Sequence, residues 1–218
     1  MVLIVKCEIK LFMGEADETR EKLIQALKAE GYLKSDKVVK AFEKVDRKEF
    51  VMKEHEKMAY ADYPLPIPGN ATISAPHMHA TVLELLDLKS DDDALEIGFG
   101  SGILLAYICE MAKKGKIVGS EINKETYKFG KSNLERMGYN PVLLNEDVTS
   151  SREMGKFDKI VVSAAAASIP QGLVKMLKNN GRMVIPVGEY FQNLFVIEKK
   201  GKKVTKRNAG GVAFVPLQ

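Results

Sequence analysis

The sequence predicts an α/β fold in which helices cover both faces of a mainly parallel sheet. From residue 93 onward, short apolar segments alternate with segments rich in helix-forming residues. The apolar segments are nearly continuous, which is typical of parallel strands buried on both faces. Near the C-terminus, segments 193–200 and 203–218 flank a short Gly-Lys turn. This arrangement predicts an antiparallel hairpin that completes the sheet.

The first third of the chain predicts helices. Segment 15–31 is rich in helix formers and ends at Gly31, a residue type that often terminates helices. In segment 35–45, Ser35 or Asp36 can cap a second helix. The apolar residues of that segment follow a helical period: Val38, Ala41, Phe42 and Val45. These helices have no evident core of their own, so we expect them to pack on the sheet.

A proline-rich segment leads from these helices toward the sheet. Segment 63–70 contains three prolines and a glycine, which predicts an extended loop. Segment 75–88 then predicts a helix, and Pro76 suits its first turn.

The remaining elements follow the α/β alternation. The expected strands are 93–100, 116–122, 141–147, 157–165 and 182–188. The expected helices are 101–115, 123–138 and 170–181.

Composition limits the class of protein. The chain has 218 residues, of which 45% are hydrophobic and 28% charged, and its net charge is +4. This balance is ordinary for a globular protein and does not require a nucleic-acid partner. No apolar run approaches the ~20 residues of a membrane helix, and the N-terminus lacks signal-peptide features. Only Cys7 and Cys109 are present, so we expect a reduced, cytoplasmic protein, and a monomer.

The glycine-rich stretch Leu95–Gly102, LEIGFGSG, is the clearest ligand-binding motif. A strand runs into Gly98, Gly100 and Gly102, where the backbone can turn tightly and approach a ligand. The dinucleotide fingerprint needs a glycine at the sixth position from Gly98, but Ile103 stands there. The motif therefore favours an adenosine-type cofactor without a pyrophosphate, S-adenosyl-L-methionine rather than NAD.

Acidic residues end the next two expected strands. Glu121 lies where a carboxylate can accept both ribose hydroxyl groups of an adenosine. Asp147 ends the third strand at the same edge, and it or the adjacent Val148 can meet the ligand. With Ser101 of the glycine turn, these residues complete the expected cofactor site on the strand ends.

Several segments together resemble the protein-L-isoaspartate (D-aspartate) O-methyltransferase family. They run from about residue 45 to the C-terminus and include AYADYPLPI, ATISAPHMHATVLELLDL, ALEIGFGSG, FDKIVVSAAAASIP and GRMVIPVGE. The resemblance implies a class I methyltransferase (Rossmann-like) fold with a mixed seven-stranded sheet. We expect one domain, 1–218, with N-terminal helices and a substrate-side loop in 1–75 and the cofactor-binding α/β core in 76–218.

The resemblance also implies an activity and a site. The implied reaction is methyl transfer from S-adenosyl-L-methionine to the α-carboxylate of L-isoaspartyl and D-aspartyl residues, a step in protein repair. The active-site serine of the family falls on Ser74, and its cofactor contacts nearby fall on Thr72 and His77. The sequence departs from the family pattern at Pro68, which stands in place of a glycine, and at 145–151, where NEDVTSS limits Val148 to backbone or apolar contact.

Ser74 raises a question of mechanism, because His77 and His79 lie close by in sequence. A hydrolytic serine sits in a G-x-S-x-G turn, which TISAP lacks. The attacking carboxylate is already ionised at neutral pH, so we expect Ser74 to orient the substrate carboxylate. The alternative is that Ser74 caps the following helix. Two histidines without a third ligand do not predict a metal site.

We expect substrate contacts from two segments, one before the sheet and one near the C-terminus. Asp62 can hold the proline-rich loop, or cap a turn. Val212 and Ala213, within Gly210–Phe214, can present backbone groups to an extended peptide. Two other functions stay open: an S-adenosylmethionine-dependent RNA methyltransferase that uses the basic turn 199–207, and a non-catalytic adenosine-binding module.

Overall fold

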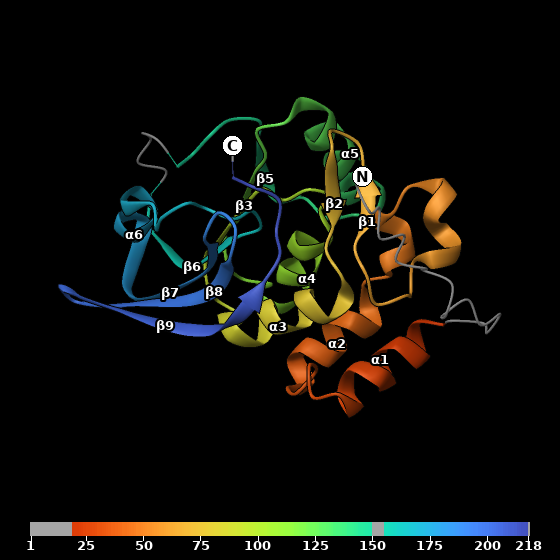
Figure 1. The fold of residues 1–218 in the computed structure, drawn as a ribbon, viewed down its shortest axis with the longest axis horizontal. Coiled ribbons are helices and arrows are strands. Elements are labelled where there is room, and N and C mark those ends of the chain that lie inside the picture. Colours follow the sequence, from red (N-terminus) through yellow and green to blue (C-terminus); the bar gives the residue numbers. More distant parts are fainter. Residues whose placement is uncertain (1–18, 150–154, 218) are drawn as a thin grey trace, which may run out of the picture.

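The fold is a seven-stranded mixed sheet with helices on both faces (Figure 1). The computed structural model describes residues 19–149 and 155–217. The strand order is β5-β4-β3-β6-β7-β8-β9. The five strands from β5 to β7 pair in parallel, whereas β8 and β9 pair antiparallel. The strands are β3 (Ala94–Ile97), β4 (Ile117–Ser120), β5 (Val142–Leu144), β6 (Phe157–Val162), β7 (Leu177–Val187), β8 (Gln192–Lys200) and β9 (Lys203–Val212). The predicted mixed sheet with its C-terminal hairpin is confirmed.

Two apolar clusters lie on opposite faces of the sheet. One contains apolar residues of α3 (Pro76–Leu86), α4 (Ile103–Met111) and α5 (Lys124–Arg136), together with alternate residues of β6 to β8. The other contains the apolar residues of α6 (Gln171–Met176), together with the strand residues that alternate with those of the first cluster. This alternation arises because successive side chains of a strand point to opposite faces.

The N-terminal helices form an outer layer. They are α1 (Arg20–Ala29), α2 (Asp36–Lys44) and the short 3₁₀ helices η1 (Arg47–Phe50) and η2 (Lys53–Met58). The expected packing on the sheet is therefore wrong in detail, because α2 packs against α3 and α4, which themselves cover the sheet. These helices share one apolar cluster with the sheet. Residues 15–18 of the first predicted helix, and Cys7, lie outside the described residues.

The cap of α2 has an unforeseen connection. Ser35 occupies the N-cap position, but its side chain makes no cap hydrogen bond. Its backbone N–H and hydroxyl instead donate to the Glu84 carboxylate of α3, at 2.8 and 3.1 Å. The two helices are therefore tied together at this end.

The predicted extended loop 63–70 is wrong only at Leu65–Ile67, which form one strand of a small antiparallel hairpin. The hairpin consists of β1 (Leu65–Ile67) and β2 (Ala71–Ile73). Pro66 points to solvent from this isolated pair, where a missing N–H is tolerated. The turn uses positive φ at Gly69 and Asn70, residue types that adopt this conformation readily.

The predicted helix 170–181 is too long. Helix α6 ends at Met176, and the buried Leu177 already pairs with Phe157 of β6. Asn180 has φ +65°, which a helix does not allow. Lys178 reaches the carboxylates of Asp93 and Asp158, at 2.8 and 2.7 Å. Tertiary pairing therefore overrides the helix propensity of this segment.

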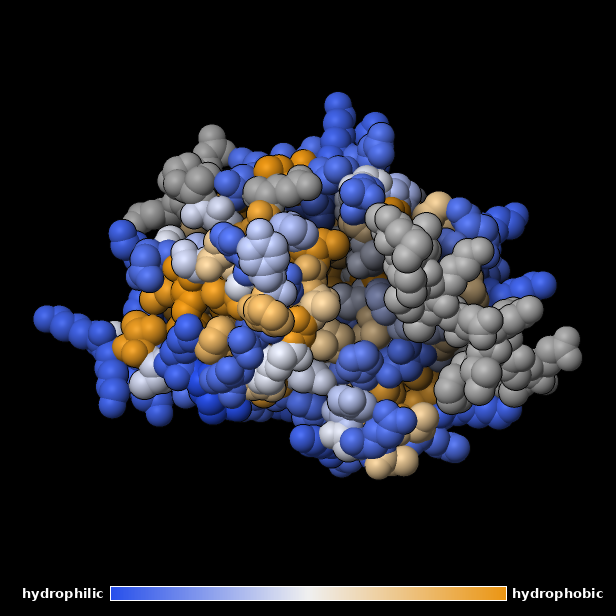
Figure 2. All heavy atoms as spheres, viewed as in Figure 1, coloured by the Kyte–Doolittle hydropathy of each residue, from blue (hydrophilic) through white to orange (hydrophobic). Residues whose placement is uncertain are grey.

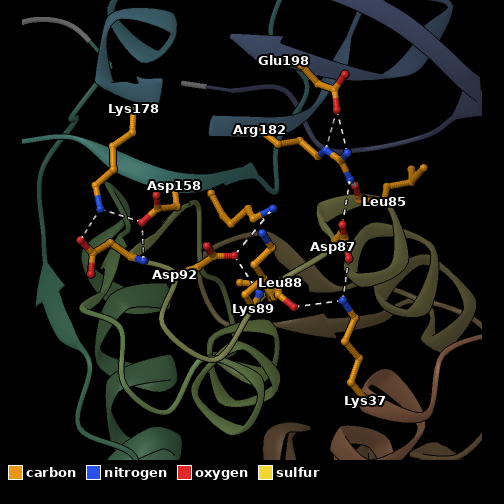
Figure 3. A network of polar contacts seen from close by, with 12 residues as sticks. Lys37, Leu85, Asp87, Leu88, Lys89, Asp92, Asp158, Lys178, Arg182 and Glu198 are labelled. Atoms are coloured by element: carbon orange, nitrogen blue, oxygen red, sulfur yellow. Dashed lines mark hydrogen bonds and ion pairs between the residues drawn. The ribbon is translucent and has the colours of Figure 1, made fainter. Parts of the chain in front are cut away.

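Polar contacts hold the edge of the sheet where the parallel strands begin (Figure 3). Arg182 of β7 donates two hydrogen bonds to the Glu198 carboxylate and one to the Leu85 carbonyl oxygen of α3. Lys37 of α2 binds Asp87, directly after α3, at 2.6 Å. Because this network joins helices and sheet at one edge, the strand ends of the opposite edge are left for a binding site.

In the part of the chain that the structure describes, no helix is long and apolar enough to span a membrane.

Candidate active site

A cavity lies at the carboxyl ends of the parallel strands. It has a volume of about 240 Å³ and is bordered by the ends of β3, β4 and β6, the turn of hairpin β1–β2 and the C-terminal segment. Figure 2 shows a hollow near the middle of this face, with apolar side chains beside it. Open α/β sheets bind ligands at this edge. The cavity includes the predicted residues Thr72, Gly98, Gly100, Glu121 and Asp147.

The glycine turn has the expected conformation. Gly98, Gly100 and Gly102 all have positive φ, at 76°, 55° and 87°. Gly98 and Gly100 face the cavity. Gly102 instead allows close helix packing, because a Cβ there would lie 2.8 Å from Leu134 Cγ of α5. Gly102 is not among the residues that line either cavity.

Gly130 of α5 packs against the same turn and leads to a testable expectation. A Cβ at this position would overlap the Gly100 carbonyl oxygen and lie 2.8 Å from Phe99 Cε2. Alanine in a helix would otherwise gain about 1 kcal/mol over glycine. We expect the overlap to prevail, so that Gly130→Ala destabilises the protein by ~1–3 kcal/mol in urea unfolding.

The matched control for this substitution is Gly211→Ala. A Cβ there meets nothing within 4 Å of the described residues. The control should unfold at nearly the wild-type urea concentration. A Gly130→Ala variant as stable as this control would show that the turn can shift to make room.

Glu121 is held at the cavity by backbone groups. Its Oε2 accepts a hydrogen bond from the Gly100 N–H at 3.2 Å, and its Oε1 accepts one from the Asn123 N–H at 3.0 Å. Only 8% of the residue is exposed. The carboxylate is thus fixed before any ligand arrives, and its oxygens keep lone pairs for hydroxyl donors.

Of the two predicted residues that follow β5, Asp147 lines the cavity and Val148 is buried. Asp147 lines the cavity, and its Oδ1 accepts hydrogen bonds from the N–H and hydroxyl of Thr149, at 2.7 and 2.6 Å. Val148 is 1% exposed and packs in the apolar cluster beside α6. Its side chain is therefore not presented to the cavity.

A smaller cavity of about 30 Å³ adjoins the glycine turn. It is lined by Ser74 and Ser101, both predicted, and by His79 and Glu96. Thr72 and Ser163 line both cavities. The helix-cap alternative for Ser74 is wrong, because Ala75 occupies the N-cap position of α3. Ser74 therefore lies at a cavity that both the glycine turn and the hairpin line.

Two buried polar groups of the smaller cavity lack partners. Glu96 is 1% exposed; its Oε1 accepts a hydrogen bond from Ser163 Oγ at 2.7 Å, and its Oε2 has none among the described residues. Burial, with a contribution from the Glu121 charge, raises the pKa of Glu96 to about 8. Nor does His79 Nδ1 have a hydrogen-bond partner in the described part of the chain, and burial lowers the pKa of His79 well below its usual value.

The structure uses His77 and Asp62 as a pair. Asp62 accepts hydrogen bonds from the His77 N–H at 2.8 Å and faces its Nδ1 at 2.9 Å, and the Tyr32 ring lies 5.2 Å away. Neither residue is among those that line the two cavities. This pair orders the first turn of α3, and His79 rather than His77 lines one of the cavities.

The C-terminal segment forms another wall of the larger cavity. Val212 ends β9 opposite Gln192, and Val215, Pro216 and Leu217 line the cavity. The Gln192 side chain donates to the Phe214 carbonyl oxygen and accepts from its N–H. Val212 and Ala213 thus lie close along the chain to the cavity wall, without lining it.

Sequence reasoning missed several lining residues. They are the turn residues Gly69, Asn70 and Ala71, together with Glu96, Ile122, Asn123 and Thr126. Glu96 had a signal, since it is a carboxylate inside an otherwise apolar strand. Asn123 had one too, as a helix cap directly after a strand. No group of three or more His, Cys, Asp or Glu suited to a metal is present among the described residues.

The mixed sheet, the glycine turn after its first parallel strand and the carboxylate after the next define the class of S-adenosylmethionine-dependent methyltransferases. Within that class, the chain belongs to the protein-L-isoaspartate(D-aspartate) O-methyltransferase family, whose model matches residues 18–218. The resemblance that the sequence carries from residue 45 therefore extends into the N-terminal helices.

Named relatives agree with this membership. A protein-L-isoaspartate O-methyltransferase of Thermococcus onnurineus (strain NA1) is 41% identical over 213 residues, 95% of this chain and 96% of its own. One of Pyrobaculum arsenaticum is 45% identical over 203 residues, 91% and 99% of the two chains. A crystal structure assigned to the same activity in Plasmodium falciparum, in complex with S-adenosyl-L-homocysteine, has a TM-score of 0.82 at 30% identity and covers 94% of this chain and 99% of its own.

Proposed function

We infer that this chain is a protein-repair methyltransferase that transfers the methyl group of S-adenosyl-L-methionine to the α-carboxylate of L-isoaspartyl, and D-aspartyl, residues in damaged proteins. The observation that carries this inference is that Ser74 and the glycine turn line one cavity at the carboxyl ends of the strands. Relatives over nearly the whole chain bear the name of this activity. The relative from Plasmodium falciparum is a complex with the demethylated cofactor.

The residues fit the cofactor without a catalytic base. When bound, the cofactor supplies a methyl group that is already activated on a sulfonium. Gly98, Gly100 and Ser101 approach it through the turn, and Glu121 accepts the ribose hydroxyl groups. Ser74 orients the substrate carboxylate, which is ionised at neutral pH and needs no proton removed. Alignment of the reacting atoms is therefore the main task of the protein.

The remaining predicted site residues differ in whether they line the cavity. Thr72 and Asp147 line the cavity and support direct contact with the cofactor. The positions of His77, Gly102 and Val148 favour indirect roles through α3, α5 and the core. Asp62 holds His77 and lines neither cavity, so its substrate contact stays a prediction, whereas Val212 and Ala213 stand where β9 leads into the cavity wall.

The experiment that tests the function uses a matched pair of peptides. One peptide contains isoaspartate and the other aspartate at the same position. With labelled S-adenosyl-L-methionine, the first should be methylated and the second should not, because the extra backbone methylene moves the reactive carboxylate. Label in tRNA or rRNA, with none in the isoaspartyl peptide, would refute protein repair.

The position of the basic turn argues against an RNA substrate. Lys199 and Lys200 lie at the tip of the β8–β9 hairpin. In the pairing of β7 with β8, the pair Arg182–Glu198 lies toward this tip, and the pair Val187–Asn193 lies at the other end, near the cavity. The basic tip is thus at the sheet edge opposite the cavity, and Figure 1 shows it projecting away from the molecule. Lys199 also donates to backbone carbonyl groups of Val174 and Leu177. A cytoplasmic location and a monomeric state stay predictions.

Glu96 is proposed as the group that receives the ammonium of the cofactor's amino-acid end. Below pH 8 the buried carboxyl is mostly protonated, because its pKa is about 8, and a neutral carboxyl attracts a cation weakly. We expect binding of S-adenosylhomocysteine, measured by calorimetry, to strengthen as pH rises from about 6 toward 8 and to release protons.

Glu96→Gln is the control, because its amide does not titrate. The variant should bind with a flat pH profile over the same range. A wild-type profile equally flat would exclude Glu96 from contact with the cofactor.

A further inference from the structure

Arg47 is a buried cation with unusual partners. It begins η1 and is only 2% exposed. Nη1 donates a hydrogen bond to the Ser74 carbonyl oxygen at 2.7 Å, and Nη2 donates one to the Tyr63 carbonyl oxygen at 3.3 Å. Nε has no hydrogen-bond partner among the described residues. Burying a guanidinium without a carboxylate partner is costly, so simple packing does not account for the choice of arginine.

The two acceptors flank hairpin β1–β2. Tyr63 lies two residues before β1, and Ser74 directly follows β2. Because Leu65 pairs with Ile73, the guanidinium bridges the open end of the hairpin. Each strand has only three residues, and so short a pair is marginal without outside support.

The turn end of the hairpin is held from a different element. Thr126 Oγ1 of α5 donates to the Pro68 carbonyl oxygen at 2.8 Å, and Asn123 Nδ2 donates to that of Gly69 at 3.3 Å. Figure 1 shows the hairpin beside α5. The segment that carries Thr72 and Ser74 is therefore fixed at one end by the cofactor-binding core and at the other by Arg47.

Building on the proposed function, we propose that Arg47 is a positioning residue for methyl transfer, which holds the Ser74 main chain so that the serine hydroxyl stays in the cavity. The guanidinium is too buried to touch the substrate itself. That separation suits the chemistry, because a cation directly on the attacking carboxylate would stabilise the ground state more than the transition state.

The charge of Arg47 persists under working conditions. Burial lowers the pKa of Arg47 to about 10, against the opposing effects of Tyr107 and Asp62. The side chain thus stays protonated at neutral pH. Burial first, and then the charge of Arg47, lowers the pKa of His79, the buried histidine of the smaller cavity.

A double-mutant cycle between Arg47→Lys and Ser74→Ala tests the proposal. Lysine keeps the charge but cannot span both carbonyl groups. At saturating cofactor and isoaspartyl peptide, we expect Arg47→Lys to lower kcat about tenfold in the wild-type background. In the Ser74→Ala background it should lower kcat less than about twofold, because the group being positioned is absent. The rate is expressed per S-adenosylhomocysteine-binding site, so that unfolded protein does not count.

Two further variants make the test decisive. Arg47→Gln replaces lysine if the latter fails to fold. Arg182→Lys is the matched control, because Arg182 also donates to a main-chain carbonyl oxygen but at the opposite edge of the sheet. It should leave kcat unchanged in both backgrounds.

The outcomes separate this inference from the function on which it rests. Any of three results would overturn the positioning role. They are an equal loss of kcat in both backgrounds, a wild-type kcat in Arg47→Lys, and loss of cofactor binding in both Arg47 variants. A wild-type enzyme that does not methylate the isoaspartyl peptide would instead refute the proposed function, and the inference with it.

Discussion

Glu121→Ala is expected to weaken binding of S-adenosylhomocysteine by ~1.5–3 kcal/mol, because charge-assisted hydrogen bonds to the ribose are lost. The same change removes the acceptor that ties the Gly100 N–H to the Asn123 N–H. The glycine turn and the start of α5 therefore lose a common anchor. Isothermal titration calorimetry of both proteins measures this loss of affinity directly.

Glu125→Ala is the control for this loss. Glu125 lies in the first turn of α5 and is exposed, so its removal changes charge and helix start without touching the cavity. It should bind the cofactor product as tightly as the wild type. Unchanged affinity in Glu121→Ala would remove Glu121 from the site.

Ser74→Ala is expected to reduce methylation of the isoaspartyl peptide by ~10–100-fold, the effect of one or two well-placed hydrogen bonds in a transition state. The fold and the affinity for cofactor should stay intact, because Ala75 rather than Ser74 is the N-cap residue of α3. Ser74→Thr should be partly active, since the hydroxyl survives while the added methyl group crowds the approach of the carboxylate. Steady-state rates and calorimetry on both variants separate these effects.

A covalent role for Ser74 would give different results. A fluorophosphonate would label the wild-type serine, and Ser74→Ala would have no activity at all. A variant as fast as wild type would exclude the orienting role as well. The pH profile should show no basic group paired with the serine, because the attacking carboxylate is already ionised and needs no proton removed.

Local patterns in the sequence were enough for the parallel core and its cofactor edge. The strands around Leu95 and Ile160 are short apolar runs, and Gly98 and Gly100 interrupt the chain where the backbone must turn. Glu121 followed from the same logic, because carboxyl ends of neighbouring parallel strands meet at one edge. These features depend on residues adjacent in the chain, so a reader of the sequence can recognise them.

Tertiary structure alone decided how the substrate side is built. The prolines of segment 63–70 predict a loop, yet Leu65–Ile67 pair with Ala71–Ile73 in a hairpin, and the carbonyl groups around it accept hydrogen bonds from Arg47, Asn123 and Thr126. Helix α6 stops at Met176 because Leu177 finds a strand partner in Phe157. Likewise, His79 rather than His77 reaches the cavity because Asp62 holds His77 at the start of α3. In each case the deciding partner is distant in sequence, and hydrogen bonds or burial formed only on folding outweigh the local preference.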